Sequence, residues 1–263
     1  MAKRAVAVIT GASSGIGVEL ARLFAANGHE LVLVARSEAP MNALAESIAA
    51  TGKSRPHVLP IDLALADAGD RLADGLERLG AEPTFVVNNA GFGLLGMAAS
   101  LDRAEQLSMI DLNVRTLTDL SLRFLPSLTA HRGGLLNVAS VAGFLPGPGQ
   151  NVYYATKAYV LSFTEALAEE LAGTGVRVCA LCPGPVPTGF QARAGVKRER
   201  KIGMLTLSAE RVAREGYDGF MAGKRLVVPG FGNKLVTLMP RLLPRSLVTK
   251  LTDARKRRLD GEV

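Results

Sequence analysis

The sequence predicts an α/β protein: a single-domain, doubly wound parallel sheet with a C-terminal helical extension. Short apolar, β-branched runs alternate with helical patterns along the first 181 residues, as in sheets built from strand–helix–strand crossovers. The runs are apolar at nearly every position, which is typical of parallel strands buried on both faces. The 263 residues, of which 48% are hydrophobic, suffice for the core of one large domain spanning residues 1–263.

The elements follow one another in a regular order. Strands are expected at residues 5–9, 30–35, 57–61, 85–88, 134–139 and 176–181, with 226–228 as a candidate seventh. Helices are expected at residues 16–27, 41–51, within 66–79, and at 101–125, 153–171, 234–243 and 244–259. The long fourth helix should end at Pro126, because proline interrupts a helix interior.

Composition excludes several classes of protein. No apolar run approaches the roughly 20 residues that a membrane-spanning helix needs, and residues 1–10 are typical of a first strand and not of a secretory signal. The two cysteines, Cys179 and Cys182, lie three apart on an expected strand, so their sulfurs should point to opposite faces. We therefore predict no metal site, no disulfide and a cytoplasmic location.

A glycine-rich turn follows the first strand, with the sequence Thr-Gly-Ala-Ser-Ser-Gly-Ile-Gly at residues 10–17. Glycines permit a tight turn, and the N–H groups at the start of the next helix attract a pyrophosphate. The predicted contacts are Gly11, Ser13, Ser14, Gly15, Ile16 and Gly17. The same turn fits the G-x-S-x-G pattern of a hydrolase nucleophile, an alternative that requires a late histidine and that a fluorophosphonate probe would test.

The end of the second strand bears on the choice of cofactor. Ala35 stands where a carboxylate would bind the ribose 2′-hydroxyl of NAD, and Arg36 follows it. A guanidinium pairs with a phosphate through two hydrogen bonds. We therefore predict NADP(H) in preference to NAD(H), with a solvated loop arginine as the alternative.

The ordered set of motifs resembles the classical short-chain dehydrogenase/reductase family, over roughly residues 4–190. The set comprises the glycine turn, Asp62, the Asn-Asn-Ala-Gly segment at 88–91, Asn113, Ser140, Tyr153 with Lys157, and Pro183-Gly184 with Thr188. The resemblance implies a Rossmann-type fold and hydride transfer between a nicotinamide cofactor and a carbonyl or secondary alcohol. Beyond residue 190 the likeness is loose.

The resemblance also assigns roles to individual residues. Tyr153 would exchange a proton with the substrate oxygen, Ser140 would hold that oxygen, Lys157 would bind the nicotinamide ribose, and Asn113 would hold a water on a proton path. Further cofactor contacts would be Tyr153 itself, Asp62, Leu63, Asn89, Ala90, Gly91, Pro183, Gly184, Val186 and Thr188. Independently, Tyr153 and Lys157 share a helix face, and a neighbouring ammonium should lower the pKa of a phenol.

The substrate side is expected to be apolar. Its walls would come from residues 92–97, residues 141–149 and a lid at 190–207, which favours a hydrophobic ketone, aldehyde, 3-oxoacyl or steroid-like substrate. The lid carries Lys197, Arg198, Arg200 and Lys201. We interpret these cations as a solvated face, with an anionic head group as the alternative.

The C-terminal extension, residues 234–263, is basic. Residues 191–263 hold 17 basic and 7 acidic side chains, whereas residues 1–190 hold 14 and 17. A helix over the substrate mouth is the first interpretation and weak peripheral membrane contact the second. We expect no nucleic-acid partner, because no aromatic residue is interleaved with these charges.

The family likeness implies a homodimer through the two long helices, with a tetramer as the alternative. Two functions from other classes stay open at this stage. A catalytically silent nucleotide-binding regulator would bind cofactor without turnover, and a membrane-recruited scaffold would bind through its tail without cofactor.

Overall fold

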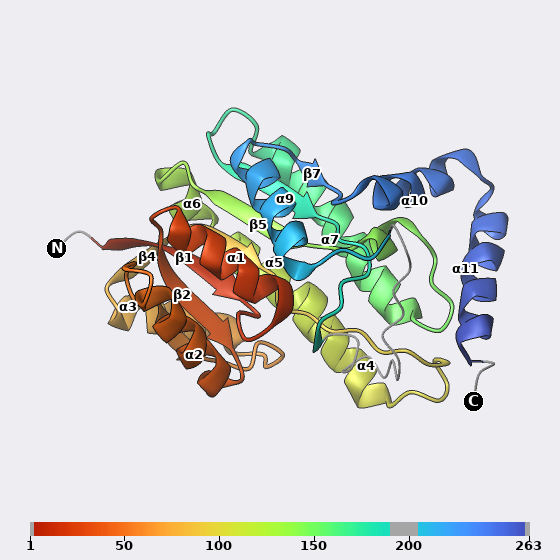
Figure 1. Cartoon of the computed structure of the whole chain (residues 1–263), viewed down its shortest axis with the longest axis horizontal. Helices are drawn as coiled ribbons and strands as arrows, with labels where there is room; N and C mark the ends of the chain where they lie inside the picture. The colour runs from red at the N-terminus through yellow and green to blue at the C-terminus, as the bar shows by residue number, and fades with distance from the viewer. Residues whose placement is uncertain (1–2, 190–204, 261–263) are drawn as a thin grey trace.

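A seven-stranded parallel sheet organises the molecule (Figure 1). The computed structural model describes residues 3–189 and 205–260. The strands lie in the order β3-β2-β1-β4-β5-β6-β7, so the chain starts at the centre and winds outward in both directions. Their bounds are Arg4–Thr10 (β1), Glu30–Ala35 (β2), His57–Pro60 (β3), Ala81–Asn88 (β4), Gly134–Val138 (β5), Arg177–Leu181 (β6) and Leu226–Val227 (β7). The predicted fold class, including the seventh strand, is confirmed.

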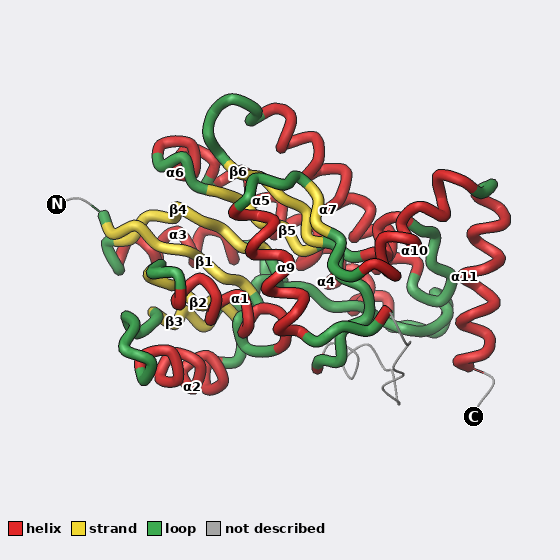
Figure 2. The backbone as a smooth tube through the Cα atoms, turned by 45° about the horizontal axis from the view of Figure 1, so that its top comes forward, coloured by secondary structure: helices red, strands yellow, loops and turns green. Residues whose placement is uncertain are grey.

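Helices cover both faces of the sheet (Figure 2). One face carries α1 (Gly15–Ala26), α2 (Glu38–Ala49) and α9 (Ala209–Met221). The other carries α3 (Ala68–Arg78), α5 (Leu117–Arg123), α6 (Leu125–Ala130) and α7 (Asn151–Glu170). The remaining helical elements are α4 (Arg103–Ile110), η1 (Asp111–Thr116), η2 (Val141–Phe144), α10 (Phe231–Leu242) and α11 (Arg245–Asp260).

The alternation of side chains along β1 shows how the two layers are held together. Val6 and Val8 point into the cluster beneath α3 and α5, while Ala7 and Ile9 point into the cluster beneath α1 and α9. All four are at most 1% exposed. Residues of a strand alternate between faces, so an uninterrupted apolar run serves both layers.

The largest differences from the predicted boundaries lie in the fourth strand and the long fourth helix. Strand β4 begins at Ala81, four residues earlier than expected; its pairing with β1 shifts register between Val6 and Ala7, where Thr84 is the extra residue of β4. The long helix is not continuous but runs as α4, the π-helical η1 and α5. Pro126 does not end it; this proline lies in the first turn of α6, where its missing N–H costs nothing.

The first of the two C-terminal helices also begins earlier than predicted. Helix α10 starts at Phe231 and continues through Pro240, which lies inside its last turn. Helix α11 follows after a short bend and leads away from the sheet (Figures 1 and 2). Of the predicted lid at 190–207, residues 190–204 lie outside the described residues, and so do the four cations at 197–201.

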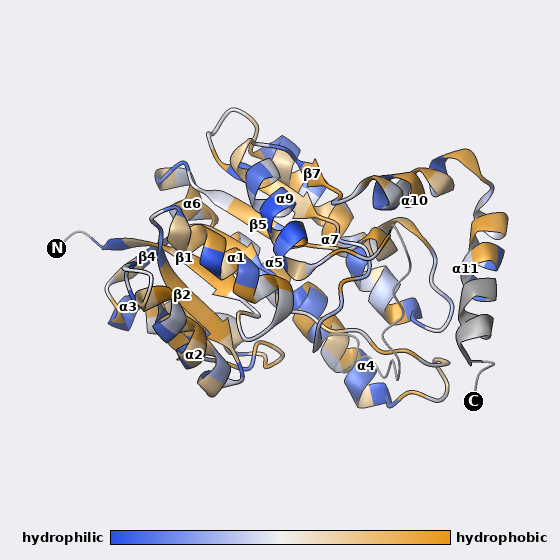
Figure 3. Ribbon diagram, viewed as in Figure 1, coloured by the Kyte–Doolittle hydropathy of each residue, from blue (hydrophilic) through white to orange (hydrophobic). Residues whose placement is uncertain are grey.

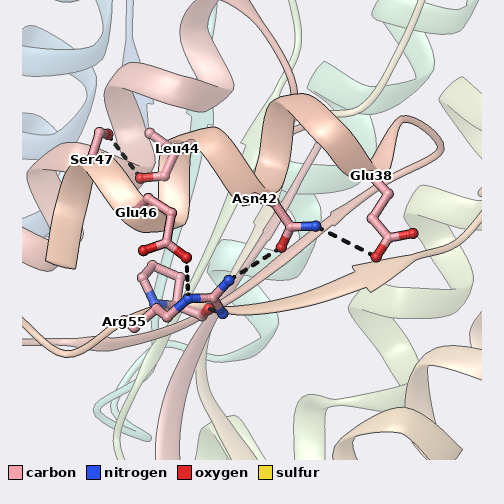
Figure 4. A network of polar contacts seen from close by, with 7 residues as sticks. Glu38, Asn42, Leu44, Glu46, Ser47 and Arg55 are labelled. Carbon is pink, nitrogen blue, oxygen red and sulfur yellow. Dashed lines mark hydrogen bonds and ion pairs between the residues drawn. The ribbon is translucent and has the colours of Figure 1, made fainter.

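A polar network on the surface of α2 fixes the connection into β3 (Figure 4). Arg55 donates from Nε to Glu46 Oε1 at 2.8 Å and from Nη2 to Asn42 Oδ1 at 3.3 Å. Asn42 in turn donates to Glu38 at 3.5 Å. Exposed pairs of this kind contribute at most about 1 kcal/mol, so the network holds a connection in place without deciding the fold.

Hydrophobic colour is concentrated in the sheet and along the inner sides of its helices, but it also extends over α10 and the first turns of α11 (Figure 3). Within the described part of the chain, no helix combines the length and apolar character that crossing a membrane requires.

Candidate active site

The glycine turn between β1 and α1 is shaped by close backbone approaches. Gly11 and Gly15 have φ values of +67° and +57°, which other residues adopt at a cost. A Cβ on Gly17 would lie 2.3 Å from the Gly11 carbonyl oxygen. No side-chain cap closes the N-terminus of α1 at Ser14, so its first N–H groups face an open cleft where an anion would be stabilised.

Hydrogen bonds from Thr10 and Asn89 hold this turn against the end of β4. Thr10 Oγ1 donates to Val87 O at 3.0 Å and accepts from the backbone N–H groups of Asn89 and Ala90 at 2.9 and 3.1 Å. Asn89 Nδ2 donates to the carbonyls of Thr10 and Gly11 at 2.9 and 3.2 Å. The Asn89 side chain therefore completes the turn instead of projecting into the cleft.

The cleft runs along the carboxyl ends of the strands, from β2 to the loop after β6. Sixteen of the eighteen residues expected to contact a cofactor line it; Gly17 and Gly184 do not. Gly17 packs behind the turn, and a Cβ on Gly184 would lie 2.2 Å from Asn233 Oδ1 of α10. Both glycines therefore permit close packing behind the cleft.

Seven lining residues were missed by the sequence prediction. They are Ala35, Ser37, Ile61, Leu112, Val138, Ala139 and Gly189. Most of them stand at or just after a strand end, so the rule that ligands bind at the carboxyl edge could have found them. Leu112 carried no such signal, because it lies in the π-helical segment.

Tyr153 and Lys157 line one end of the cleft, and Ser140, which does not line it, contacts the Tyr153 phenol. Ser140 follows β5 and hydrogen-bonds the phenol of Tyr153. Lys157, on the next turn of α7, donates from Nζ to Val138 O at 2.8 Å and lies 5.9 Å from the centre of the Tyr153 ring. The spacing of four residues on α7 brings both side chains to the same face.

The local environment shifts both titrations. Burial raises the pKa of Tyr153 to about 12, and the hydrogen bond from Ser140 offsets part of that rise. Burial lowers the pKa of Lys157 to about 8. The expectation that Lys157 lowers the phenol's pKa is wrong for this structure, because burial dominates and the ammonium is bonded to Val138 O.

Asn113 lies in η1, where the helix widens to a π-helical turn, and it is fully buried. Its amide pairs with the backbone of Phe92, accepting from the N–H at 3.1 Å and donating to the carbonyl at 2.9 Å. Nδ2 also donates to Thr156 Oγ1 at 3.1 Å. Asn113 thus joins the end of β4 to α7, within one residue of Lys157, and a π-bulge at this position is typical of a functional site.

A second buried network, which the sequence prediction missed, ties β4 and β5 to the same helices. Asn88 Nδ2 donates to Ser121 and to Asn137 Oδ1, both at 3.0 Å. Asn137 Nδ2 donates to Thr164 Oγ1 of α7 at 3.0 Å. Buried polar groups demand such partners, and this series of hydrogen bonds fixes α7 against β5, which ends at Val138 two residues before Ser140.

The described residues do not support the hydrolase alternative or a metal centre. None of the three histidines, His29, His57 and His131, lines the cleft. No described group of three or more His, Cys, Asp or Glu side chains could hold a metal ion. Cys179 and Cys182 are free, buried and packed into clusters on opposite faces of the sheet, and burial raises the pKa of both thiols.

The cleft fits an extended dinucleotide. An open helix N-terminus and a glycine turn stand at its middle, Arg36 and Ser37 at one end, and Tyr153 and Lys157 at the other. Fold and site together define an α/β oxidoreductase that uses a nicotinamide cofactor.

Comparison with known proteins identifies the family. A profile described as "short chain dehydrogenase" matches residues 5–199, and the chain belongs to that family. Sulfoacetaldehyde reductase 2 of Chromohalobacter salexigens is 38% identical over 188 residues, covering 70% of this chain and 74% of the relative.

Two solved structures share the whole fold. A short-chain dehydrogenase from Sphingobium yanoikuyae in complex with NADPH aligns with a TM-score of 0.76 and 28% identity, over 99% of this chain and 96% of the other. A short chain dehydrogenase/reductase from Burkholderia phymatum in complex with NAD aligns with a TM-score of 0.75 and 27% identity, over 86% and 89%. The family therefore supports a nicotinamide cofactor without deciding between the two forms.

Proposed function

We propose that this protein is an NADP(H)-dependent reductase that interconverts a hydrophobic carbonyl compound and its secondary alcohol. The observation that carries the proposal is that Tyr153, which contacts Ser140, and Lys157 line one end of a cleft whose other end holds Arg36. The bound cofactor would supply or accept the hydride. All other chemistry falls to these side chains.

Tyr153 is the proposed acid–base group. With a pKa of about 12 it stays protonated at neutral pH and can donate to a carbonyl oxygen that is gaining negative charge. The single hydroxyl proton of Ser140, which is directed at Pro183 O at 3.3 Å in the structure, would turn to the same substrate oxygen. Lys157 would hold the cofactor's ribose beside this pair, and Asn113 would support the path that restores the Tyr153 proton.

Arg36 supports NADP(H) as the preferred form. Its side chain is exposed at the edge of the cleft beside Ser37, and the strand before it ends in Ala35 without a carboxylate. A guanidinium and a hydroxyl there would bind a 2′-phosphate, and the strand's last residue is an alanine where a carboxylate would repel it. The other proposed cofactor contacts are the lining residues that the sequence analysis named.

The described substrate walls favour an apolar compound. Residues 92–97 and 141–149 hold no charged side chain, and Phe92, Leu94 and Ala142 are buried among them. A second candidate substrate is a small anionic aldehyde, since a relative is named a sulfoacetaldehyde reductase. Comparing kcat/KM for an aliphatic or cyclic ketone with that for sulfoacetaldehyde separates the two.

A homodimer through α4, α5 and α7 is the proposed assembly. These helices expose Leu107, Ile110, Leu122 and Tyr159, each 39–49% accessible. Apolar side chains of this size on adjacent helices are typical of a subunit interface. Sedimentation of the wild type against a Leu107→Glu variant would test it, with a tetramer as the alternative result. The cytoplasm is the proposed location, consistent with two free, buried cysteines.

The decisive experiment compares two adjacent tyrosines. Tyr153→Phe should lower NADPH-dependent carbonyl reduction at least roughly 1,000-fold, the upper range of an acid–base contribution, while the Kd for NADPH stays within a few-fold. Tyr154→Phe, its neighbour with the same change, should keep turnover within about threefold. Full activity in Tyr153→Phe would overturn the mechanism. Cofactor binding without turnover on any carbonyl by the wild type would favour a silent regulator.

A further inference from the structure

Helix α10 has its apolar and polar faces reversed relative to a core-facing helix. Its exposed positions include Phe231, Leu235, Leu238 and Leu242, which are 68%, 50%, 44% and 78% accessible. Their spacing of four, three and four residues places them in one stripe. The buried positions are instead Gly232, Asn233 and Thr237. The side that packs on the protein is the small and polar one, so the apolar stripe faces outward.

Helix α11 continues the stripe around the bend. Leu247 and Leu251, one turn apart, are 43% and 44% accessible. Six of the twelve large hydrophobic residues exposed in the described chain therefore lie between residues 231 and 251. In Figure 3 the hydrophobic colour passes from α10 onto the start of α11. Contiguous exposed apolar surface of this kind marks an interaction site.

The charge beside the stripe is positive. Arg241 on α10 and Lys250 on α11 are exposed next to the leucines. Lys234 is exposed as well, but it lines a hollow together with Glu215 and Asp218 of α9. Helix α10 contains no acidic residue, and the sequence of α11 has two acidic residues, Asp253 and Asp260, against six basic ones. The surface that would accept this face must be both apolar and negatively charged.

We propose that α10 and α11 form a docking face for an anionic lipid surface, on which the protein lies peripherally. Leucine and phenylalanine side chains would enter the acyl boundary while Arg241 and Lys250 meet the lipid phosphates. A second copy of this chain fits less well, because a two-fold contact would set the same excess of cations against itself. The face is separate from the proposed dimer helices.

The docking face lies close to the catalytic end of the cleft, so membrane docking would bring the site near substrates in the bilayer. Helix α10 packs against η2, the turn that begins directly after Ser140. This clause of the inference rests on the proposed function: a hydrophobic carbonyl dissolved in the bilayer would then have a short route to the site. The docking itself does not depend on it.

Vesicle flotation tests the proposal with the full chain. Wild-type protein should float with vesicles of equimolar phosphatidylcholine and phosphatidylglycerol. With vesicles of phosphatidylcholine alone it should stay in the bottom fraction of the gradient. Two double variants address the two halves of the face, Leu238→Ser/Leu242→Ser and Arg241→Glu/Lys250→Glu. Each should weaken binding to the anionic vesicles by roughly tenfold or more, since each basic residue near such a surface contributes appreciably.

Matched controls separate the face from general effects. Lys53→Glu/Arg78→Glu makes the same change in net charge at exposed sites outside α10 and α11. Leu65→Ser removes an exposed leucine outside the docking face. Both control variants should bind the anionic vesicles like the wild type. NADPH binding by every variant reports an intact fold and fails separately if the proposed function is wrong.

Three outcomes would overturn the docking proposal. One is absence of flotation by the wild type, and another is equal binding to both kinds of vesicle. The third is a wild-type oligomer in sedimentation, without vesicles, that Leu238→Ser/Leu242→Ser dissociates, since that would show a second copy covering the face.

Discussion

The strand-end cleft places polar groups at the rim of an apolar core, whereas the C-terminal arm of α10 and α11 places apolar groups outside a polar seam. In the cleft, the functional side chains hydrogen-bond to one another or to fixed carbonyls, as Lys157 does to Val138 O. On the arm, the leucines of the stripe are exposed and make no such directed contacts. The function of the cleft therefore depends on the positions of single atoms. The function of the arm depends on its total apolar area and charge.

This difference predicts how each region responds to substitution. A position in the cleft is defined to a fraction of an ångström by backbone packing, so a single change should remove a function completely. The stripe depends on summed apolar area and charge, so single changes should be mild and double changes additive. The predictions below test this contrast, beginning with the largest expected effect.

Gly17→Ala should abolish cofactor binding. The added Cβ would lie 2.3 Å from Gly11 O and 2.6 Å from Asn89 Nδ2, so the turn must move away from the helix start. We expect the Kd for NADPH to rise more than about 100-fold, measured by the fluorescence of the bound cofactor.

The control is Gly28→Ala, at the other end of α1. Gly28 has φ +86° and no atom within 4 Å of its added Cβ, so the cost should be limited to about 1–2 kcal/mol of backbone strain with NADPH affinity preserved. If Gly17→Ala also bound NADPH like the wild type, the turn would not be the pyrophosphate site.

Ser140→Ala should slow carbonyl reduction by about 100-fold while leaving NADPH affinity within a few-fold. The hydroxyl bonds the Tyr153 phenol and would also bond the substrate oxygen, and loss of one such donor has an effect of this size. Single-turnover rates with NADPH give the measurement. A larger defect in cofactor binding than in rate would reassign Ser140 to the cofactor.

The two regions also differ in how much of them the sequence could predict. Parallel strands end at one edge, so Asp62, Asn89, Ser140 and Pro183 had to converge once the strands were located. The helix spacing placed Tyr153 and Lys157 together in the same way. These inferences need only periodicity and local geometry.

Other features depended on packing that a single sequence does not reveal. Helix α10 starts at Phe231 and its leucines point outward because Asn233 and Thr237 are buried. Burial of two polar residues is the reverse of what their residue types predict. The titration of Tyr153 was predicted with the wrong sign, because the distance to Lys157 and the extent of burial are tertiary properties. Leu112 lines the cleft from a π-helical turn, and no sequence motif predicted that turn.

Arg36→Ala should raise the KM for NADPH by roughly 10- to 100-fold and leave the KM for NADH nearly unchanged. The lost interaction is a charge-assisted pair with a 2′-phosphate, which NADH lacks. Arg71→Ala, an exposed arginine on α3 away from the cleft, is the matched control. An unchanged ratio of the two KM values in Arg36→Ala would remove the assignment of NADP(H).

Lys157→Met should stabilise the protein at neutral pH while it removes activity. Burial holds the pKa of Lys157 at about 8 against 10.5 in a free chain, so the charged form is destabilised in the folded state. The unfolded state binds the extra proton between these values, and wild-type stability therefore rises with pH across that window. After the lost bond to Val138 O is subtracted, the variant should gain roughly 2 kcal/mol at pH 7.

Urea unfolding at pH 7 and at pH 10.5 measures this effect. The advantage of the Lys157→Met variant should shrink at the higher pH, where the wild-type lysine is neutral in the folded state and only about half protonated in the unfolded state. A variant less stable than the wild type at both values would mean that the ammonium is well solvated where it lies, and the cleft would then resemble the open surface of the arm.

The smallest predicted effect lies at the joint between the two regions. Asn233, 1% exposed, donates from Nδ2 to Pro229 O at 2.9 Å and to Leu205 O at 3.2 Å, and it packs against Gly184 beside the cleft. Asn233→Ala leaves one buried and one partly buried carbonyl without this donor, which should lower the free energy of unfolding by about 1–3 kcal/mol. Thr237→Ala, whose hydroxyl bonds only to Lys234 O within its own helix, should lower it by less than about 1 kcal/mol. If neither variant lowered the free energy of unfolding measurably, the hydrogen bonds of Asn233 would not hold α10 against the protein. The buried polar side of α10 would then contribute nothing to the outward orientation of the leucine stripe.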